Sequence, residues 1–133
     1  MNIKFKQASL EYVTNLKSGD EVYVASNFYG KIKKISKDKI KTITKKKREI
    51  KTEMKYHLNS SGHSLYEKYS MSNYYIIEPT KENLKNIEFF SLFCEVINNF
   101  EKEMINEATE EELLFLKVMI NRINKRSKEN LND

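Results

Sequence analysis

The stretch LKSGDEVYVASNFYGKIKKISKDKIKTI, residues 16–43, carries the clearest fold signals in this chain of 133 residues. A Gly-Asp turn signal at 19–20 precedes a Val-Tyr-Val run at 22–24, and these residue types have high strand preference. Further on, isoleucines alternate with lysines and threonines over 39–44, which is typical of a half-buried strand. The polar segment 36–39 before it predicts a hairpin turn, so this stretch predicts antiparallel strands.

A last strand is predicted at Tyr74–Ile77, because this short apolar run ends at Glu78-Pro79 and proline cannot donate a ladder hydrogen bond. Between residues 45 and 73 the pattern is weaker, with a loop signal at 59–62. Four to five short strands before Pro79 predict a small, strongly bent β-barrel over residues 1–79.

The rest of the chain predicts two helices. Thr80 is placed to cap a helix whose apolar residues recur every three or four positions from Leu84 to Met104. The run Thr109–Glu112 is a capping box that predicts the start of a second helix, and its inner face is expected to hold Leu113, Leu116, Ile120 and Ile123. The short connection at 106–109 predicts that the two helices run antiparallel.

The sequence therefore predicts an α+β fold, with a basic β-barrel over 1–79 and an antiparallel helical hairpin over 80–133. The apolar stripes are wider than a two-helix seam needs, so the hairpin is expected to pack on the barrel or on a second subunit, as in a homodimer. Phe115 and Met119 are the residues expected at a protein interface.

Charge is distributed unevenly along the chain. Residues 1–78 contain 16 Lys/Arg and 8 Asp/Glu, a net charge of +8, whereas residues 79–133 contain 8 and 11, a net charge of −3. Within 31–51 there are eleven basic residues and two acidic ones. This run is either a solvated, solubilising face or a patch that contacts phosphates. The phosphate hypothesis uses Lys31, Lys33, Lys34, Lys37, Lys39, Lys41, Lys45, Lys46, Lys47 and Arg48.

Three tyrosines are candidates for stacking on nucleic-acid bases. Tyr56, Tyr66 and Tyr69 alternate with basic residues, a pattern suited to single-stranded bases or RNA loops. Each of them could equally belong to the core or rim of a barrel.

Sequence signals for catalysis are weak. His57 and His63 lack cysteines or carboxylates at zinc-ligand spacing, and Cys94 lies within an apolar helical stripe where a thiol behaves as a small hydrophobe. No phosphate-binding glycine loop, nucleophile elbow or HExxH motif is present. We therefore expect a binding protein that is not an enzyme and uses no metal or cofactor. With no signal-peptide core and no membrane-spanning run of apolar residues, a cytoplasmic protein without a membrane partner is expected.

The stretch quoted at the outset, together with YYIIEPT at 74–80 and the charged helical tail, resembles short bacteriophage proteins similar to KOW and other Src-homology-type small barrels. The resemblance covers residues 16–80, and it departs from the family where EIKTEMKYHLN (49–59) replaces expected glycines. It implies a module that binds nucleic acid or a nucleic-acid machine, with no shared catalytic residues.

Two functions follow as hypotheses. The first is binding of nucleic acid, with single strands or RNA favoured, or of a host nucleoprotein complex through the lysine-rich face. The second is an anti-CRISPR-type inhibitor of a phage or mobile element that blocks a host defence protein by direct contact. The composition does not distinguish these two functions. The dependence of affinity on salt concentration does, because binding through phosphate contacts weakens steeply with salt and binding through an apolar interface does not.

Overall fold

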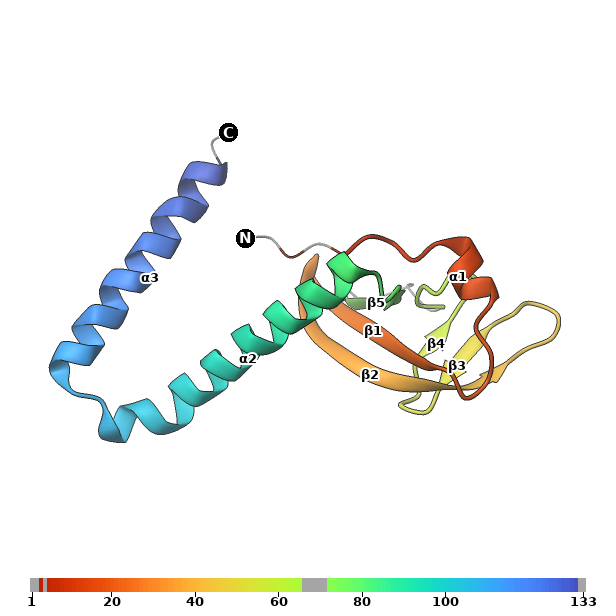
Figure 1. Ribbon diagram of the computed structural model, residues 1–133, viewed down its shortest axis with the longest axis horizontal. Helices are drawn as coiled ribbons and strands as arrows, with labels where there is room; N and C mark the ends of the chain where they lie inside the picture. Colours follow the sequence, from red (N-terminus) through yellow and green to blue (C-terminus); the bar gives the residue numbers. More distant parts are fainter. Residues whose placement is uncertain (1–2, 4, 66–71, 132–133) are drawn as a thin grey trace. The chain divides into compact units, whose positions relative to one another are not determined.

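The computed structural model describes residue 3, residues 5–65 and residues 72–131 (Figure 1). It divides into two compact units, residues 1–91 and 92–133, which are described separately. The elements in chain order are α1 (Leu10–Thr14), β1 (Glu21–Phe28), β2 (Lys31–Ile43), β3 (Ile50–Thr52), β4 (His57–Leu58), β5 (Ser72–Ile77), α2 (Lys81–Glu107) and α3 (Glu110–Leu131). The expected α+β class, a bent sheet followed by two helices, is confirmed.

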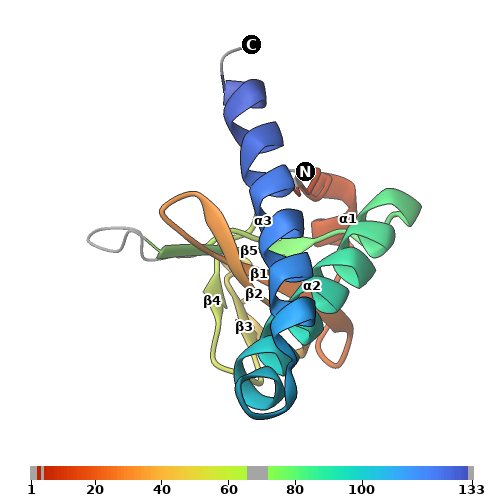
Figure 2. The ribbon, with the colours of Figure 1, turned by 90° about the vertical axis from the view of Figure 1, so that its left-hand side faces the viewer.

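The five strands form one antiparallel sheet in the order β4-β3-β2-β1-β5. β2 is the longest strand and pairs with β1 along its first part and with β3 near its end. Irregular pairing between Ser26 and Asn27 in β1, and between Ile40 and Thr42 in β2, marks two bulges. Because a bulge increases local twist and bends the strand, these positions help the sheet to curl into a half-barrel (Figure 2).

The core lies on the concave face of this sheet. The largest fully buried apolar side chains come from all five strands and from α1: Val13, Val22, Val24, Ile40, Ile50, Leu58, Ile76 and Ile77. The bulge after Ile40 leaves Lys41 and Thr42 exposed while Ile43 still packs against the core. α1, which we did not expect from the sequence, is capped at its N-terminus by Ser9, whose hydroxyl accepts a hydrogen bond from the Tyr12 amide at 3.2 Å. Its Val13 closes one side of the core.

The hairpin turn expected at 36–39 is wrong, because β2 continues through it. Ser36 and Asp38 lie on the core side of β2 and are buried, while Lys37 and Lys39 alternate outward. The Asp38 carboxylate accepts hydrogen bonds from the Lys39 amide at 2.7 Å and from the Met54 amide at 3.2 Å. Because its buried oxygens have hydrogen-bond partners, Asp38 can lie within a strand. The polar residues at 36–39 therefore do not form a turn.

The actual turn between β1 and β2 is the pair Tyr29-Gly30. Both residues have positive φ, 52° and 74°, as required at the two central positions of a type I′ hairpin. Glycine is the usual second residue of this turn, whereas tyrosine is unusual at the first. The strands expected after Gly19-Asp20 and at Tyr74–Ile77 are confirmed as β1 and β5.

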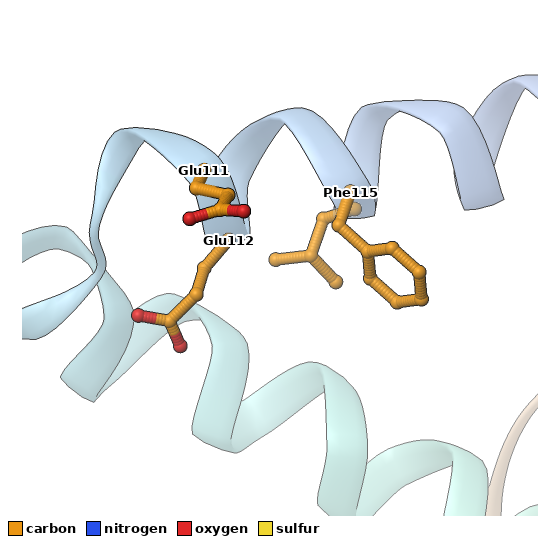
Figure 3. A pocket seen from close by; sticks show the side chains of 4 residues that line it. Glu111, Glu112 and Phe115 are labelled. Atoms are coloured by element: carbon orange, nitrogen blue, oxygen red, sulfur yellow. The ribbon is translucent and has the colours of Figure 1, made fainter.

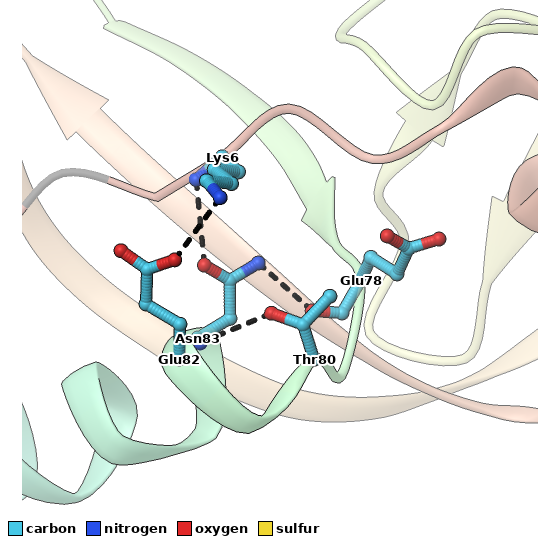
Figure 4. A network of polar contacts seen from close by, with 5 residues as sticks. All are labelled: Lys6, Glu78, Thr80, Glu82 and Asn83. Carbon is cyan, nitrogen blue, oxygen red and sulfur yellow. Dashed lines mark hydrogen bonds and ion pairs between the residues drawn. The ribbon is translucent and has the colours of Figure 1, made fainter.

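The first turn of α2 is fixed to the end of β5 and to the N-terminal segment (Figure 4). The Asn83 amide donates to the Thr80 hydroxyl at 3.1 Å, which confirms Thr80 as the expected cap. The buried Asn83 side chain donates to the Glu78 carbonyl at 2.9 Å and accepts from the Lys6 amide at 3.3 Å. This residue therefore joins three separate segments of the chain.

In the second unit the chain turns back between α2 and α3 at Ala108-Thr109 (Figure 1). The predicted capping box is confirmed. The Thr109 hydroxyl donates to the Glu112 carboxylate at 2.9 Å and accepts from the Glu112 amide at 3.2 Å, while the Thr109 amide donates to the same carboxylate at 3.2 Å. The side chains expected on the inner face of α3 stay open, because Leu113, Ile120 and Ile123 are 48%, 47% and 53% exposed.

The capping box predicts a pH dependence for the start of α3. The two hydrogen bonds from Thr109 hold the pKa of Glu112 below its ordinary value of 4.5. Because the folded pKa is the lower one, the contribution of the cap is complete above pH 4.5 and is lost as pH falls through the lowered pKa. Cα chemical shifts of residues 110–113 should therefore move toward coil values on acidification. Glu112→Gln keeps an acceptor without titrating, so an equal acid transition in this variant would contradict the assignment.

Candidate nucleic-acid interface

The lysines of β2 lie along one extended strand. Register and alternation place Lys37 and Lys39 on the face opposite the core, next to Tyr23 and Glu21 of β1. Lys37 Nζ lies 3.5 Å from a Glu21 carboxylate oxygen, but both side chains are about 60% exposed. An ion pair this exposed is worth little. Lys37 can therefore exchange Glu21 for a phosphate at small cost.

The β2–β3 loop presents a second group of lysines. The Arg48 amide donates to the Thr44 carbonyl at 3.1 Å, and the Glu49 amide donates to the Thr44 hydroxyl at 2.9 Å, so the loop closes on Thr44. The three residues Lys45, Lys46 and Lys47 form the exposed turn between them. Three adjacent ammonium groups on a closed turn are a compact source of positive potential.

Arg48 differs from these lysines in its contacts. Its guanidinium donates from Nη2 to the backbone carbonyls of Thr14 at 2.8 Å and of Val13 and Leu16 at 3.4 Å. These bonds satisfy carbonyls at the C-terminal end of α1, where a positive charge is favourable. Arg48 therefore joins the loop to α1, and its guanidinium is already engaged.

The structure places one of the three candidate tyrosines. Tyr56 is half-buried and packs against the core, with its hydroxyl 3.4 Å from Ser26 Oγ and 3.3 Å from Ser36 Oγ. Its ring is 5.0 Å from the ring of Tyr74, which leaves little of it for stacking on a base. Tyr66 and Tyr69 lie outside the described residues.

Sequence reasoning missed the aromatic residues at the tip of the β1–β2 hairpin. Phe28 and Tyr29 are 40% and 63% exposed, and their rings meet edge to face with centroids 4.5 Å apart. Lys33 Nζ lies 4.7 Å from the centroid of the Phe28 ring, within cation–π range. The available signal was the Phe-Tyr-Gly run that directly precedes the lysines.

His63 and Tyr75 are two further titratable residues near β5. His63 Nε2 lies 2.9 Å from the Gln7 side-chain nitrogen, and the described residues contain no group of three or more potential metal ligands. Burial raises the pKa of Tyr75 above 10.0, although a hydrogen bond with Asn27 opposes the shift, so this phenol stays neutral near pH 7.

A shallow pocket lies on the first turns of α3, lined by Glu111, Glu112, Phe115 and Leu116 (Figure 3). Its two carboxylates disfavour a phosphate ligand, and its apolar wall fits a protein side chain better. Phe115 is 65% exposed and Met119 is 40% exposed, so both residues expected at a protein interface are accessible on this helix.

Comparison with family models, curated proteins and solved structures gave no match. Among the described residues, no helix combines the length and apolar character needed to span a bilayer.

Proposed function

We propose that this protein binds single-stranded nucleic acid, RNA in particular, through the lysine face, defined as Lys31, Lys33, Lys34, Lys37, Lys39, Lys41, Lys45, Lys46 and Lys47. The observation that carries the proposal is that all nine of these side chains are exposed. They lie along a single strand and the loop at its end, so the positive charge is distributed along this part of the chain.

Positive charge distributed along an extended strand suits a polynucleotide backbone. Thirteen residues of β2 correspond to roughly 40 Å of strand at about 3.3 Å per residue, and the β2–β3 loop extends beyond its end. Proteins that bind single strands without sequence preference combine such a basic track with exposed aromatic rings, at about 4–16 nucleotides per small barrel. The single acidic residue within β2, Asp38, is buried and bonded to backbone amides, so it does not interrupt the track.

The proposal is tested by fluorescence anisotropy with labelled 15-nucleotide RNA, the same DNA sequence, and duplex DNA in 50 mM salt. We expect saturable binding with single strands preferred over duplex. Preference for the duplex would contradict the choice of single strands, and failure to bind all three would refute the proposal.

A second candidate function is inhibition of a host protein by direct contact, as in an anti-CRISPR-type inhibitor. It is favoured by the apolar side chains that stay exposed on α3, among them Leu114, Phe115 and Val118 at 56%, 65% and 49%. The same surface would serve a homodimer, which light scattering of the purified protein would detect. If no nucleic acid binds and the protein is monomeric, this candidate becomes the stronger one.

A further inference from the structure

The tip of the β1–β2 hairpin contains a residue that its own turn disfavours. Tyr29 occupies the first central position of a type I′ turn with φ of 52°. L-residues other than asparagine, aspartate and glycine seldom adopt this conformation, because Cβ approaches the following carbonyl oxygen. Asn-Gly is the preferred pair for such a turn. Turn chemistry therefore does not explain a tyrosine at this position.

Core packing does not explain it either. Tyr29 is 63% exposed, and its ring meets that of its neighbour Phe28 edge to face. The hairpin tip stands out from the rest of the sheet in Figure 2. Next to the turn, the side-chain oxygen of Asn27 is buried and lacks a hydrogen-bond partner among the described residues. Residues with a strained backbone conformation occur at functional sites more often than elsewhere.

The rings of Phe28 and Tyr29 differ in how much of each is open to a ligand. Phe28 has the Lys33 ammonium over its face at 4.7 Å, and the edge-to-face contact with Tyr29 has an interplanar angle of 86°. Phe28 is therefore occupied by these contacts and packs against Tyr29, whose ring is the more exposed of the two. The Lys33 ammonium, which lies over the neighbouring Phe28 ring, is placed to pair with a phosphate.

From this arrangement we infer that the tip of the β1–β2 hairpin is a base-stacking site, in which the Tyr29 ring takes one nucleobase of a single-stranded nucleic acid, Phe28 braces that ring and Lys33 contacts the adjoining phosphate. The site lies at the start of β2, so a strand that follows the lysine face would reach it at one end. This inference rests on the proposed function, and it adds a contact to the bases that the lysines alone do not make.

The test separates stacking from phosphate contacts with two probes of equal charge. One is a 12-nucleotide oligo(dT), and the other is an abasic oligonucleotide with the same number of phosphates and no bases. One stacked base contributes about 1–3 kcal/mol, so wild-type protein should bind oligo(dT) about tenfold more tightly than the abasic probe. Equal affinity for both would overturn the stacking site and leave the proposed function standing. Binding of neither probe would overturn the stacking site as inferred, and the RNA arm of the anisotropy experiment would then decide whether the proposed function fails with it.

The informative variant is Tyr29→Asn, because asparagine suits the type I′ turn and keeps the hairpin. Its melting temperature should equal or exceed that of the wild type, its affinity for the abasic probe should be unchanged, and its preference for oligo(dT) should fall to about twofold or less. Leu10→Asn removes a 67% exposed apolar residue from α1, an element remote from the tip of the hairpin (Figure 1), and should retain the tenfold preference. An unchanged preference in Tyr29→Asn, or an equal loss in Leu10→Asn, would contradict the assignment.

Discussion

Replacing Lys45, Lys46 and Lys47 together by alanine is expected to weaken binding to single-stranded RNA about 100-fold in 0.1 M salt. For single strands, each neutralised phosphate contributes about 0.7 to the slope of log K against log salt. Between 1 M and 0.1 M salt, each such contact therefore raises log K by about 0.7. Losing three contacts lowers log K at 0.1 M salt by about two. The slope itself should become less steep by about two. Because all three side chains are exposed, the melting temperature should not change.

A matched control separates contact from net charge. Lys117, Lys125 and Lys128 on α3 are also exposed, and their joint replacement by alanine likewise lowers the net charge from +5 to +2. This control should lose less than threefold in affinity. Equal losses in the two triple variants would mean that binding responds to overall charge, and full affinity in the loop variant would exclude the β2–β3 loop from the interface.

The second large effect is expected on stability, from Asp38→Ala. Asp38 is 4% exposed, and its carboxylate accepts from the Lys39 and Met54 amides. Hydrogen bonds to charged groups contribute about 1.5–3 kcal/mol each, and amides left without a partner add to the loss. We expect the free energy of unfolding to fall by about 3 kcal/mol. Equilibrium unfolding in urea measures it.

Asp38→Asn provides the comparison, because its amide oxygen can still accept both backbone bonds. It should cost less than half as much as Asp38→Ala. A loss of under 0.5 kcal/mol in the alanine variant would show that the contacts between β2 and the β3–β4 turn are dispensable. Binding by folded Asp38→Asn should match the wild type, since Asp38 faces the core.

Several elements could be predicted because their signals are local. The Thr109–Glu112 capping box needs only residues three apart, and it forms as expected. Thr80 caps α2 for the same reason, and β1 and β5 follow from short runs of strand-forming residues beside clear turn signals. In each case the residues that decide the element are its own neighbours in the chain.

Features that depend on distant partners could not be predicted. Asp38 was expected in a turn because a polar residue inside a strand needs a partner. That partner, the Met54 amide, lies sixteen positions away and is not evident from the sequence. Arg48 could not be distinguished from the adjacent lysines, since its guanidinium bonds carbonyls more than thirty residues earlier in the chain. For Tyr56 the sequence allowed both a stacking residue and a core residue, and only the folded chain shows that it packs against the core.

The candidate site was therefore only partly visible in the sequence. The exposed lysines follow from composition, because ammonium groups rarely become buried. The exposure and backbone strain of Tyr29 depend on the exact position of the hairpin turn, and the sequence prediction put a turn at 36–39, within the continuous strand β2. With the turn placed at 29–30, the sequence would also have indicated that Phe28 and Tyr29 lie at the tip of the hairpin.

The measurement that tests the central claim most directly is the affinity of the wild-type protein for a 15-nucleotide single-stranded RNA from 50 to 400 mM salt. If the lysine face binds phosphates, log K falls linearly with log salt, and four to six contacts give a slope between about −3 and −4. A slope near zero, or no binding at 50 mM salt, would contradict the account.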